Sequence, residues 1–436
     1  MVRAPEALLR EIRRGGQVYL IVRLVTGGLT LLSLMLLTRV LGPAEYGRYG
    51  YALSVIALLV TFGQLGLPTQ IIRETAAART VEEWEAARGL WRWSMRNSVL
   101  LACILSAGTG LFFLWRGQVG GSTGDVSLPL IALLVPVMTV ALNNRVAILR
   151  GLRFVGTATV LQNTVPVIAL IVVVAPAAFL FGVRGIRAEH ILTLDLAALV
   201  TAVAVAALIL RWRGSARTLE TTRVVYRQRY WIAATVPLAV IVGLRTINTN
   251  IGVLMLGAFE SAEDIGFYKI AVRLATFAFI GEEIIVMVLG PYFAKLWAER
   301  DTQTLETICR RAARLSLLLS CSVLAAFVFF GREIIAIAFG AEFAPSQTPL
   351  LILIGGYVAT VCIGAGGTLL NMTGHEKYTA KGAMIGTFLN VGLNLALIPL
   401  LGINGAAIAT SISLIASFAY MWLCVRKAMS VRLGVF

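Results

Sequence analysis

Residues 41–52 read LGPAEYGRYGYA, and a related stretch, DIGFYKIA, returns at residues 264–271. Three positions of the first stretch recur in the second at one constant offset: Gly47, Tyr49 and Ala52 against Gly266, Tyr268 and Ala271. A second pair, FGVRGI at 181–186 and LGINGA at 401–406, has an offset that differs by only one residue. Two pairs in the same order and nearly in phase indicate one duplicated domain. In a membrane protein, such a duplication is typical of a transporter whose site lies between the halves.

The composition is that of a membrane protein. Hydrophobic residues make up 58% of the 436 residues and charged residues 14%, whereas soluble domains average about half and about a quarter. Apolar stretches of about 20 residues, long enough to cross a bilayer as helices, recur along the chain. We place twelve spans at 17–40, 47–70, 94–115, 128–149, 156–181, 190–210, 232–257, 265–291, 313–339, 348–371, 379–400 and 405–425.

The basic residues alternate with the predicted spans. They gather at the N-terminus and in the segments 73–92, 150–153, 211–229, 295–314, 377–381 and 426–432, while the intervening connections carry few. By the positive-inside rule this basic set is cytoplasmic, which places both termini inside. The net charge of +16 is therefore a topology signal, with contact to anionic lipid headgroups as a further effect. We expect no nucleic-acid partner.

An even number of spans in each half fixes how the halves relate. Six spans return the chain to the side it started from, so the halves share one orientation and a pseudo-two-fold axis along the membrane normal. The predicted domains are an N-terminal six-helix bundle at 1–210, a basic cytoplasmic linker at 211–231, and a C-terminal six-helix bundle at 232–436. The five cysteines and two histidines show no metal-ligand spacing, so neither a metal site nor a cofactor is expected.

Three stretches resemble the polysaccharide-biosynthesis flippases, the O-antigen and exopolysaccharide group of the multidrug/oligosaccharidyl-lipid/polysaccharide exporter superfamily. They are LGPAEYGRY at 41–49, DIGFY at 264–268 with the following Ala271 and Arg273-Leu274, and 390–410, which ends in LLGINGAAIAT. The likeness covers the whole chain in order. The lipid II flippases of the same superfamily resemble it less, because they usually carry two extra spans.

The resemblance implies an all-α integral membrane fold in which two six-helix bundles form a V around a central cavity. It also implies movement of an undecaprenyl-pyrophosphate-linked oligosaccharide, an O-antigen or exopolysaccharide repeat unit, from the inner to the outer leaflet of the bacterial cytoplasmic membrane. The expected partners are that lipid-linked oligosaccharide, membrane lipid, and a polysaccharide polymerase with glycosyltransferases. No enzymatic activity is expected, because the outward connections are short and the chain has no phosphate-binding loop motif.

Moving a pyrophosphate through hydrocarbon needs a hydrated, cationic cavity. Arginine suits this task because its planar guanidinium binds phosphate oxygens bidentately and stays charged. A charge inside a span faces a cavity or a partner by default. The candidate cavity residues are Arg23, Arg48, Arg245, Lys269 and Arg273. Lys269 and Arg273 are four residues apart and share one helix face. Two alternatives stay open: a structural ion pair or snorkelling for Arg23, and an interface anchor for Arg48.

Two adjacent acids, Glu282 and Glu283, lie inside the predicted span 265–291. Adjacent residues of a helix point about 100° apart, so at most one faces the cavity squarely. One role is coupling to an H+ or Na+ gradient, and the other is neutralising a cavity arginine. The membrane potential or removal of the product are the other energy sources. Asn390 and Asn394 are spaced i, i+4, and we interpret them as glue between helices.

Three other functions compete with the flippase interpretation. A multidrug or other small-molecule exporter on the same fold would prefer acidic cavity groups for cationic drugs, whereas arginines outnumber acids in these spans. A membrane glycosyltransferase, ligase or polymerase acting on the same lipid carrier needs a sizeable outer loop or a catalytic carboxylate at a membrane edge. A scaffold for other envelope enzymes is the third alternative.

The alternation of basic loops predicts which positions are reachable from outside. In a background without native cysteines, single cysteines at Ser122 and Ala262 should react with an impermeant thiol reagent added to intact cells. A cysteine at Ser215 should stay unlabelled until the cells are opened. Labelling of the Ser215 position in intact cells would reverse the predicted orientation.

Overall fold

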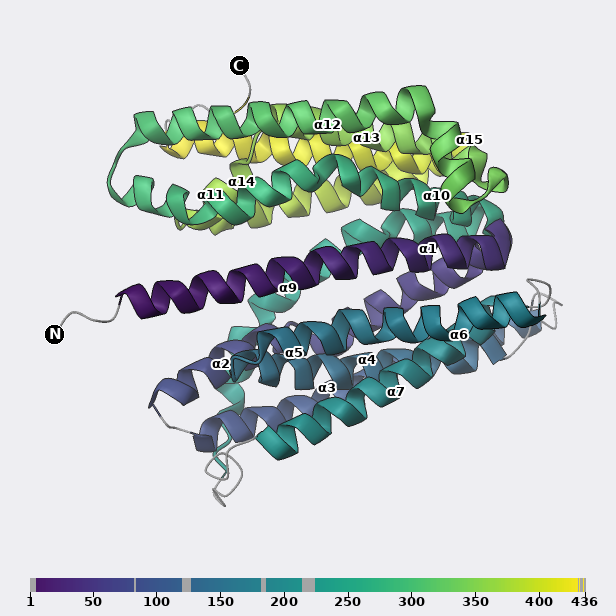
Figure 1. Cartoon of the computed structure of the whole chain (residues 1–436), viewed down its shortest axis with the longest axis horizontal. Helices are drawn as coiled ribbons and strands as arrows, with labels where there is room; N and C mark the ends of the chain where they lie inside the picture. The colour runs from purple at the N-terminus through teal and green to yellow at the C-terminus, as the bar shows by residue number, and fades with distance from the viewer. Residues whose placement is uncertain are drawn as a thin grey trace. The chain divides into compact units, whose positions relative to one another are not determined.

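The computed structural model describes residues 5–81, 84–119, 127–181, 186–213, 224–429, 431 and 434. It describes the side chains at these positions except at 5–26, 81, 112–119, 127–132, 177–181, 213, 283–288 and 291. Within these residues all regular structure is helical (Figure 1). The elements in chain order are α1 (Pro5–Gln64), α2 (Leu67–Val81), α3 (Trp84–Val119), α4 (Ser127–Gly151), α5 (Val155–Thr159), η1 (Val160–Thr164), α6 (Val165–Phe181), α7 (Ala188–Arg213), α9 (Gln228–Phe259), α10 (Ala262–Ala275), η2 (Thr276–Phe279), α11 (Ile280–Ala298), α12 (Thr302–Phe339), η3 (Ala341–Ser346), α13 (Gln347–Ile363), α14 (Gly366–Met372) and α15 (Glu376–Met429).

Many of these helices are suited to a bilayer. Within the described residues, eight helical stretches are long and apolar enough to cross a membrane: Gly27–Gln64, Leu133–Gly151, Val155–Pro176, Ala188–Trp212, Gln228–Phe259, Thr302–Phe339, Ala341–Ile363 and Glu376–Met429. Their outward faces are apolar. On α12, for example, Leu318, Phe329 and Ile337 are 65%, 74% and 71% exposed, which suits contact with lipid rather than water. The chain is a multi-pass membrane protein.

Two of the eight stretches contain a sharp break at a glycine. Gly42 interrupts α1 with φ 68° and ψ 177°, and Gly402 interrupts α15 with φ 57° and ψ −134°. Glycine reaches a positive φ at little cost because it has no Cβ. The predicted spans 17–40 and 47–70 lie on either side of Gly42, and 379–400 and 405–425 on either side of Gly402. The total of twelve spans and their division into two bundles stay predictions.

Two predicted span boundaries are wrong. The helix expected at 47–70 ends at Gln64, because Leu65 and Gly66 take left-handed conformations with φ 47° and 75° before α2 begins. The helix expected at 348–371 is interrupted at Gly364, which has φ 92°. Apolar side chains continue across both turns, so hydropathy alone does not reveal them.

Residue contacts divide the chain into two compact units. The first unit comprises Met1–Leu41 and Val55–Gly243, and the second comprises Gly42–Ser54 and Leu244–Phe436. The short segment 42–54, which carries the first copy of the repeated motif, therefore packs within the second unit. The predicted domain limits at 210 and 232 stay a prediction.

Helix α4 is central to the first unit, where it packs against α2, α3 and α7. Large side chains of α4, such as Leu142 and Leu149, meet the small Ala202 and Ala206 of α7 in a buried cluster. A hydrogen bond of 2.7 Å from Asn144 Nδ2 to Ser98 Oγ joins α4 to α3. Apolar packing, together with this neutral hydrogen bond, thus holds α3, α4 and α7 together.

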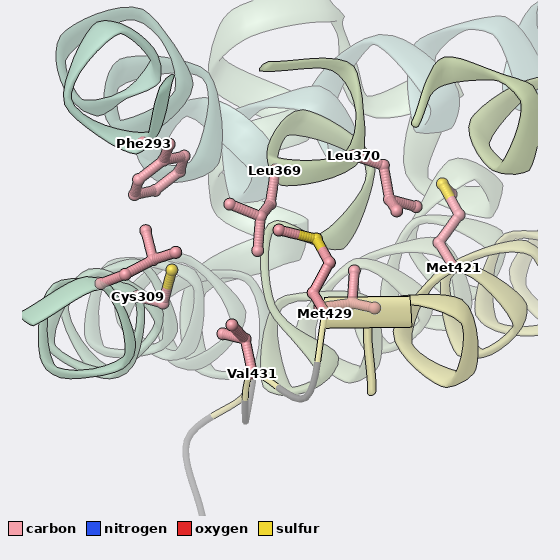
Figure 2. Close-up of a cluster of buried hydrophobic side chains, with 9 residues drawn as sticks. Phe293, Cys309, Leu369, Leu370, Met421, Met429 and Val431 are labelled. Atoms are coloured by element: carbon pink, nitrogen blue, oxygen red, sulfur yellow. The ribbon is translucent and has the colours of Figure 1, made fainter. Parts of the chain in front are cut away.

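The second unit has a core rich in sulfur and leucine. Figure 2 shows Phe293 of α11, Cys309 of α12, and Leu369 and Leu370 of α14 gathered with Met421 and Met429 of α15. All of these side chains are buried. Methionine fills irregular spaces between helices because it is unbranched and flexible. The core fixes α11, α12, α14 and α15 together.

Hydrogen-bonding caps mark the start of two helices in the second unit. Asp301 precedes α12 and accepts a hydrogen bond of 3.0 Å from the Thr304 amide. Bonds from the side chain and backbone of Thr304 hold the pKa of the Asp301 carboxyl below its usual value. Ser261 caps α10 in the same way by accepting from the Asp264 amide. Such caps satisfy amides that have no partner inside the helix.

Within the second unit, the two copies of the repeated motif touch each other through their glycines. A Cβ placed on Gly47 would overlap the Ala262 carbonyl and lie 2.9 Å from the Gly266 nitrogen. A Cβ placed on Gly266 would overlap the Pro43 carbonyl and lie 3.4 Å from the Gly47 nitrogen. Ala262 corresponds to Pro43 by the same offset that relates the two glycines. The contact is therefore reciprocal, as in a two-fold arrangement.

The glycine contact predicts the effect of adding a single methyl group. Gly47→Ala or Gly266→Ala should destabilise the protein by about 1–3 kcal/mol, because backbone atoms on the facing segment have no room to yield. Gly392→Ala is the matched control, since no atom lies within 4 Å of its Cβ position. The measurement is the fraction of detergent-solubilised protein that stays monodisperse after heating. Equal heat stability of Gly47→Ala and Gly392→Ala would refute the close contact.

Candidate functional site

The second copy of the motif places two basic side chains on one helix. Lys269 and Arg273 lie one turn apart on α10, which begins after the Ser261 cap. Lys269 is half-buried and Arg273 is exposed. They are close enough to repel each other electrostatically. Two positive charges at this spacing have the chemistry that an anion with several oxygens requires, and binding of such an anion stays a prediction.

The first copy of the motif provides the surface against which these cations lie. A Cβ on Gly50 would lie 3.1 Å from both Cγ and Cε of Lys269, so the lysine stem passes directly over this glycine. Gly50 is the repeat equivalent of Lys269. Arg273 lies within electrostatic range of Tyr46. The structure thus brings together the first motif copy and the predicted pair Lys269 and Arg273.

The other predicted cations are placed differently. Arg48 forms an ion pair of 2.8 Å with Glu45, three residues earlier, and its side chain is 60% exposed. This geometry favours the alternative of an interface anchor. Arg245, on α9, is exposed. Arg23 lies in α1, but its side chain is outside the described residues. The role of all five cations in a cavity stays a prediction.

The predicted acid Glu282 is buried on α11, with 4% of its surface exposed. It lies against Ser316 of α12 and within electrostatic range of Cys309. Among the residues whose side chains are described, no ion pair joins Glu282 to Lys269 or Arg273. The side chain of Glu283 lies outside the described residues. A buried carboxyl without a basic partner is a candidate for binding a proton.

A chain of neutral amides joins α15 to α9 within the second unit. Asn390 Nδ2 donates to Asn248 Oδ1 at 2.7 Å, and Asn394 Nδ2 donates to Asn390 Oδ1 at 2.6 Å. Asn390 and Asn394 are fully buried. The amides of α15 thereby join α9, as the i, i+4 spacing of the two residues predicts. Uncharged groups supply this connection, and they are cheaper to bury in a membrane than charges.

Two polar features were not predicted from the sequence. Tyr268, beside Lys269, has its hydroxyl 3.1 Å from Thr410 Oγ1 of α15. In the first unit, Tyr230 donates to Glu74 at 3.3 Å and accepts from Arg73 at 3.2 Å, at a pocket of about 700 Å³. The tyrosine that both motif copies share, Tyr49 and Tyr268, was a sequence signal for the contact of Tyr268. The second joins positions more than 150 residues apart, so no local pattern marks it.

Sequence models of two protein families match the chain. A family described as polysaccharide biosynthesis protein matches residues 12–297. A family described as lipid II flippase MurJ matches residues 227–434. The first match includes both copies of the repeated motif, and the two matches together extend over nearly the whole chain.

Individual proteins with related sequence or structure are also known. A probable low-salt glycan biosynthesis flippase, Agl15 of Haloferax volcanii, is 25% identical over 164 residues, which cover 37% of this chain and only 34% of that protein. An inward-facing multidrug resistance MATE family transporter of the MOP superfamily has a TM-score of 0.73 at 16% identity, covering 94% of this chain and 98% of its own. The lipid II flippase MurJ in an inward closed conformation has a TM-score of 0.69 at 15% identity, covering 93% and 87%. At these identities the two structures establish a shared fold.

The amide chain predicts a measurable coupling between α9 and α15. Asn390→Ala should lower the stability by about 1–3 kcal/mol, because it removes the donor to the half-buried Asn248 Oδ1 and one of the two acceptors of the buried Asn394 Nδ2, which keeps only the Asn390 backbone carbonyl. In a double-mutant cycle, Asn248→Ala and Asn390→Ala should show a coupling of about 0.6–1.7 kcal/mol in reversible detergent unfolding. Asn250→Ala is the control, since within the described residues the Asn250 side chain bonds only to the Thr246 carbonyl of its own helix. Additive effects of the pair would contradict the interhelical bond.

Proposed function

We propose, from the premise that this chain belongs to the polysaccharide biosynthesis protein family, that it is a flippase for a lipid-linked oligosaccharide. Its substrate would be an oligosaccharide on undecaprenyl pyrophosphate, an O-antigen or exopolysaccharide repeat unit. The chain would carry this molecule from the inner to the outer leaflet of the bacterial cytoplasmic membrane, with both termini in the cytoplasm. Partners would include membrane lipid, a polysaccharide polymerase and glycosyltransferases.

The observation that carries this proposal is the pair Lys269 and Arg273 on α10, held against the first motif copy. A pyrophosphate has negatively charged oxygens on two adjacent phosphorus atoms, and two cations one turn apart match that length. Both side chains keep some exposure, so their charges can reach a hydrated space. Arg23, Arg48 and Arg245 would extend the positive region, with Arg48 the least suited because it is paired with Glu45.

We propose alternating access as the mechanism. Twelve spans would form two six-helix bundles related by a pseudo-two-fold axis, in a V around the cavity. The reciprocal contact of Gly47 and Gly266 supports such an axis. The two bundles would rock about it, opening first inward and then outward. The sugar and pyrophosphate would occupy the cavity while the polyprenyl tail stays in lipid.

Transport against a gradient needs an energy source outside the chain's own chemistry, since the sequence has no phosphate-binding loop for ATP. We propose an H+ or Na+ gradient, with Glu282 or Glu283 as the coupling carboxylate. Glu282 is buried against Ser316 and has no basic partner among the described side chains. Cyclic protonation would remove and restore its charge as the cavity changes sides.

The multidrug exporter is the second candidate function, favoured by the structural likeness to a MATE transporter. A multidrug exporter needs a substrate-binding site of the opposite charge from that of the flippase. A site for cationic drugs requires an accessible carboxylate inside the cavity, whereas Lys269 and Arg273, the charges beyond the first turn of α10, are positive; its acids Glu263 and Asp264 lie in the first turn. An enzyme acting on the same lipid carrier would need a catalytic group at a membrane edge, and the acid of α11 described here is buried.

The cavity cations predict a specific loss of flipping. In liposomes holding a fluorescent lipid-linked oligosaccharide, the Lys269→Gln, Arg273→Gln double variant should flip at least about tenfold more slowly, because each lost charged hydrogen bond contributes about 1.5–3 kcal/mol. Arg273→Lys should retain more activity than Arg273→Ala, since lysine keeps the charge and loses the bidentate geometry. Arg310→Gln, Arg311→Gln on α12 is the control of equal charge.

The same liposomes distinguish the alternatives. A wild-type flipping rate in the Lys269, Arg273 double variant would refute the cationic site. Export of cationic drugs without movement of the lipid-linked sugar would favour the multidrug exporter. Imposed pH or Na+ gradients should accelerate the wild type, and Glu282→Gln should abolish that acceleration while leaving passive flipping. An unchanged response in Glu282→Gln would exclude Glu282 as the coupling group.

A further inference from the structure

A pocket of about 590 Å³ lies in the first unit, where α3, α4 and α7 meet. It contains none of the predicted transport residues. Four arginines line it, two from α3 and one each from α4 and α7: Arg92, Arg96, Arg145 and Arg211. All four lie at the basic end of their helices, the end predicted to be cytoplasmic. Four positively charged side chains around one pocket favour the binding of an anion.

The floor of this pocket is apolar and firmly packed. Ile148 of α4 is 6% exposed and belongs to a buried cluster, against which Trp91, Leu152 and Leu210 pack. The indole nitrogen of Trp91 donates a hydrogen bond of 2.9 Å to Thr75 Oγ1, which fixes the plane of the ring. A fully hydrated anion such as free phosphate would gain nothing from such a floor. An anion attached to hydrocarbon would.

The four arginines have no acid to neutralise them within the described residues. Neither Arg92, Arg96, Arg145 nor Arg211 forms an ion pair with a described carboxylate. Arg145 is half-buried, and its guanidinium is positioned by donating to the Ala141 carbonyl at 3.0 Å and contacting Met95 Sδ at 3.8 Å. These contacts fix the group without neutralising it. A partly buried cation in such a setting is stabilised by an external anion.

The surface that continues from the arginines along α3 and α7 is amphipathic, with a cationic end and an apolar remainder. On α3 the exposed residues Arg96, Leu100 and Ile104 follow each other at i, i+4 spacing, and the latter two are 56% and 58% exposed. On α7, Leu208 and Val205 precede the arginine and are each 44% exposed. Both helices thus change from cationic to apolar in the same direction, away from the basic end.

An aromatic side chain marks the depth of the pocket in the membrane. Trp212 follows Arg211 and is 77% exposed, although tryptophan is costly to leave in water. Tryptophan prefers the level of the lipid headgroups, where its ring meets apolar groups and its nitrogen meets water. This preference favours a position of the adjacent Arg211, and of the pocket that it lines, at the level of lipid phosphates.

We propose that this pocket is a binding site for an anionic glycerophospholipid. The phosphate of the headgroup lies among the four arginines, and the upper part of an acyl chain covers Trp91 and Ile148. The rest of the acyl chains follow the apolar faces of α3 and α7. Basic pockets between helices at the cytoplasmic side of a membrane recognise such headgroups. The lipid neutralises the arginines and anchors the first unit at the inner surface.

Tryptophan quenching tests the proposal on the intact protein in proteoliposomes. Phosphatidylglycerol with brominated acyl chains should quench more fluorescence than brominated phosphatidylcholine at the same mole fraction. The excess should fall in Trp91→Phe, whose ring lies on the pocket floor. In Arg92→Gln, Arg96→Gln, binding of phosphatidylglycerol measured by native mass spectrometry should weaken roughly fivefold for each arginine. Both arginines are exposed on α3, so these replacements leave the packing unchanged.

Arg310→Gln, Arg311→Gln is the control of equal charge on α12, and its lipid binding should equal that of the wild type. An equal loss in this control would show that only the net charge attracts the lipid, and the proposal would fail. It would also fail if phosphatidylcholine bound as tightly as phosphatidylglycerol. Displacement of phosphatidylglycerol by an equimolar amount of a polyprenyl diphosphate would assign the pocket to the substrate lipid and overturn the proposal as well.

Discussion

The direct contact between two backbone segments, at Gly47 and Gly266, is the constraint on which the second unit depends. A side chain at either position would force the segments apart. Because both positions are glycine, the start of the second predicted span lies against α10 over its first turns. That contact places Gly50 under the stem of Lys269 and holds the face of α10 that carries Tyr268. Through the hydroxyl of Tyr268, the same arrangement extends to Thr410 on α15.

Charge and polarity are distributed according to what a membrane tolerates. Neutral amides and hydroxyls fill the interior positions, as in the chain from Asn248 to Asn394. The basic groups of α10 keep some exposure, and the arginines of the pocket formed by α3, α4 and α7 lie at the ends of their helices. An arginine in the centre of a bilayer costs at least about 2.5 kcal/mol, whereas an interhelical amide bond contributes about 0.6 kcal/mol. Glu282 departs from this distribution, because it is an ionisable side chain buried on α11. An ionisable group in such a position is a functional candidate.

The sequence predicts the helical class and which residues share a helix face, but not the turns or the contacts between distant helices. Hydropathy locates the spans because a bilayer requires a long apolar run. It misses the left-handed pair Leu65 and Gly66, where apolar residues continue through the turn. Lys269 and Arg273 could be joined from their spacing alone, as could Asn390 and Asn394. The grouping of Arg96, Arg145 and Arg211 requires knowing that α3 and α7 both pack on α4, and no local pattern contains that information.

The reciprocity of the glycine contact has a consequence for the ancestry of the chain. The glycine of each motif copy contacts the other copy: Gly47 lies against the Ala262 carbonyl, and Gly266 lies against the Pro43 carbonyl. Pro43 and Ala262 are equivalent positions of the repeat. A self-complementary contact of this kind is the isologous interface of a symmetric dimer. Before the duplication, a half-length ancestor could have made it between two separate, identical chains. Divergence after such a fusion would account for Lys269 in one copy and Gly50 in the other, while both copies carry a glycine at the contact itself.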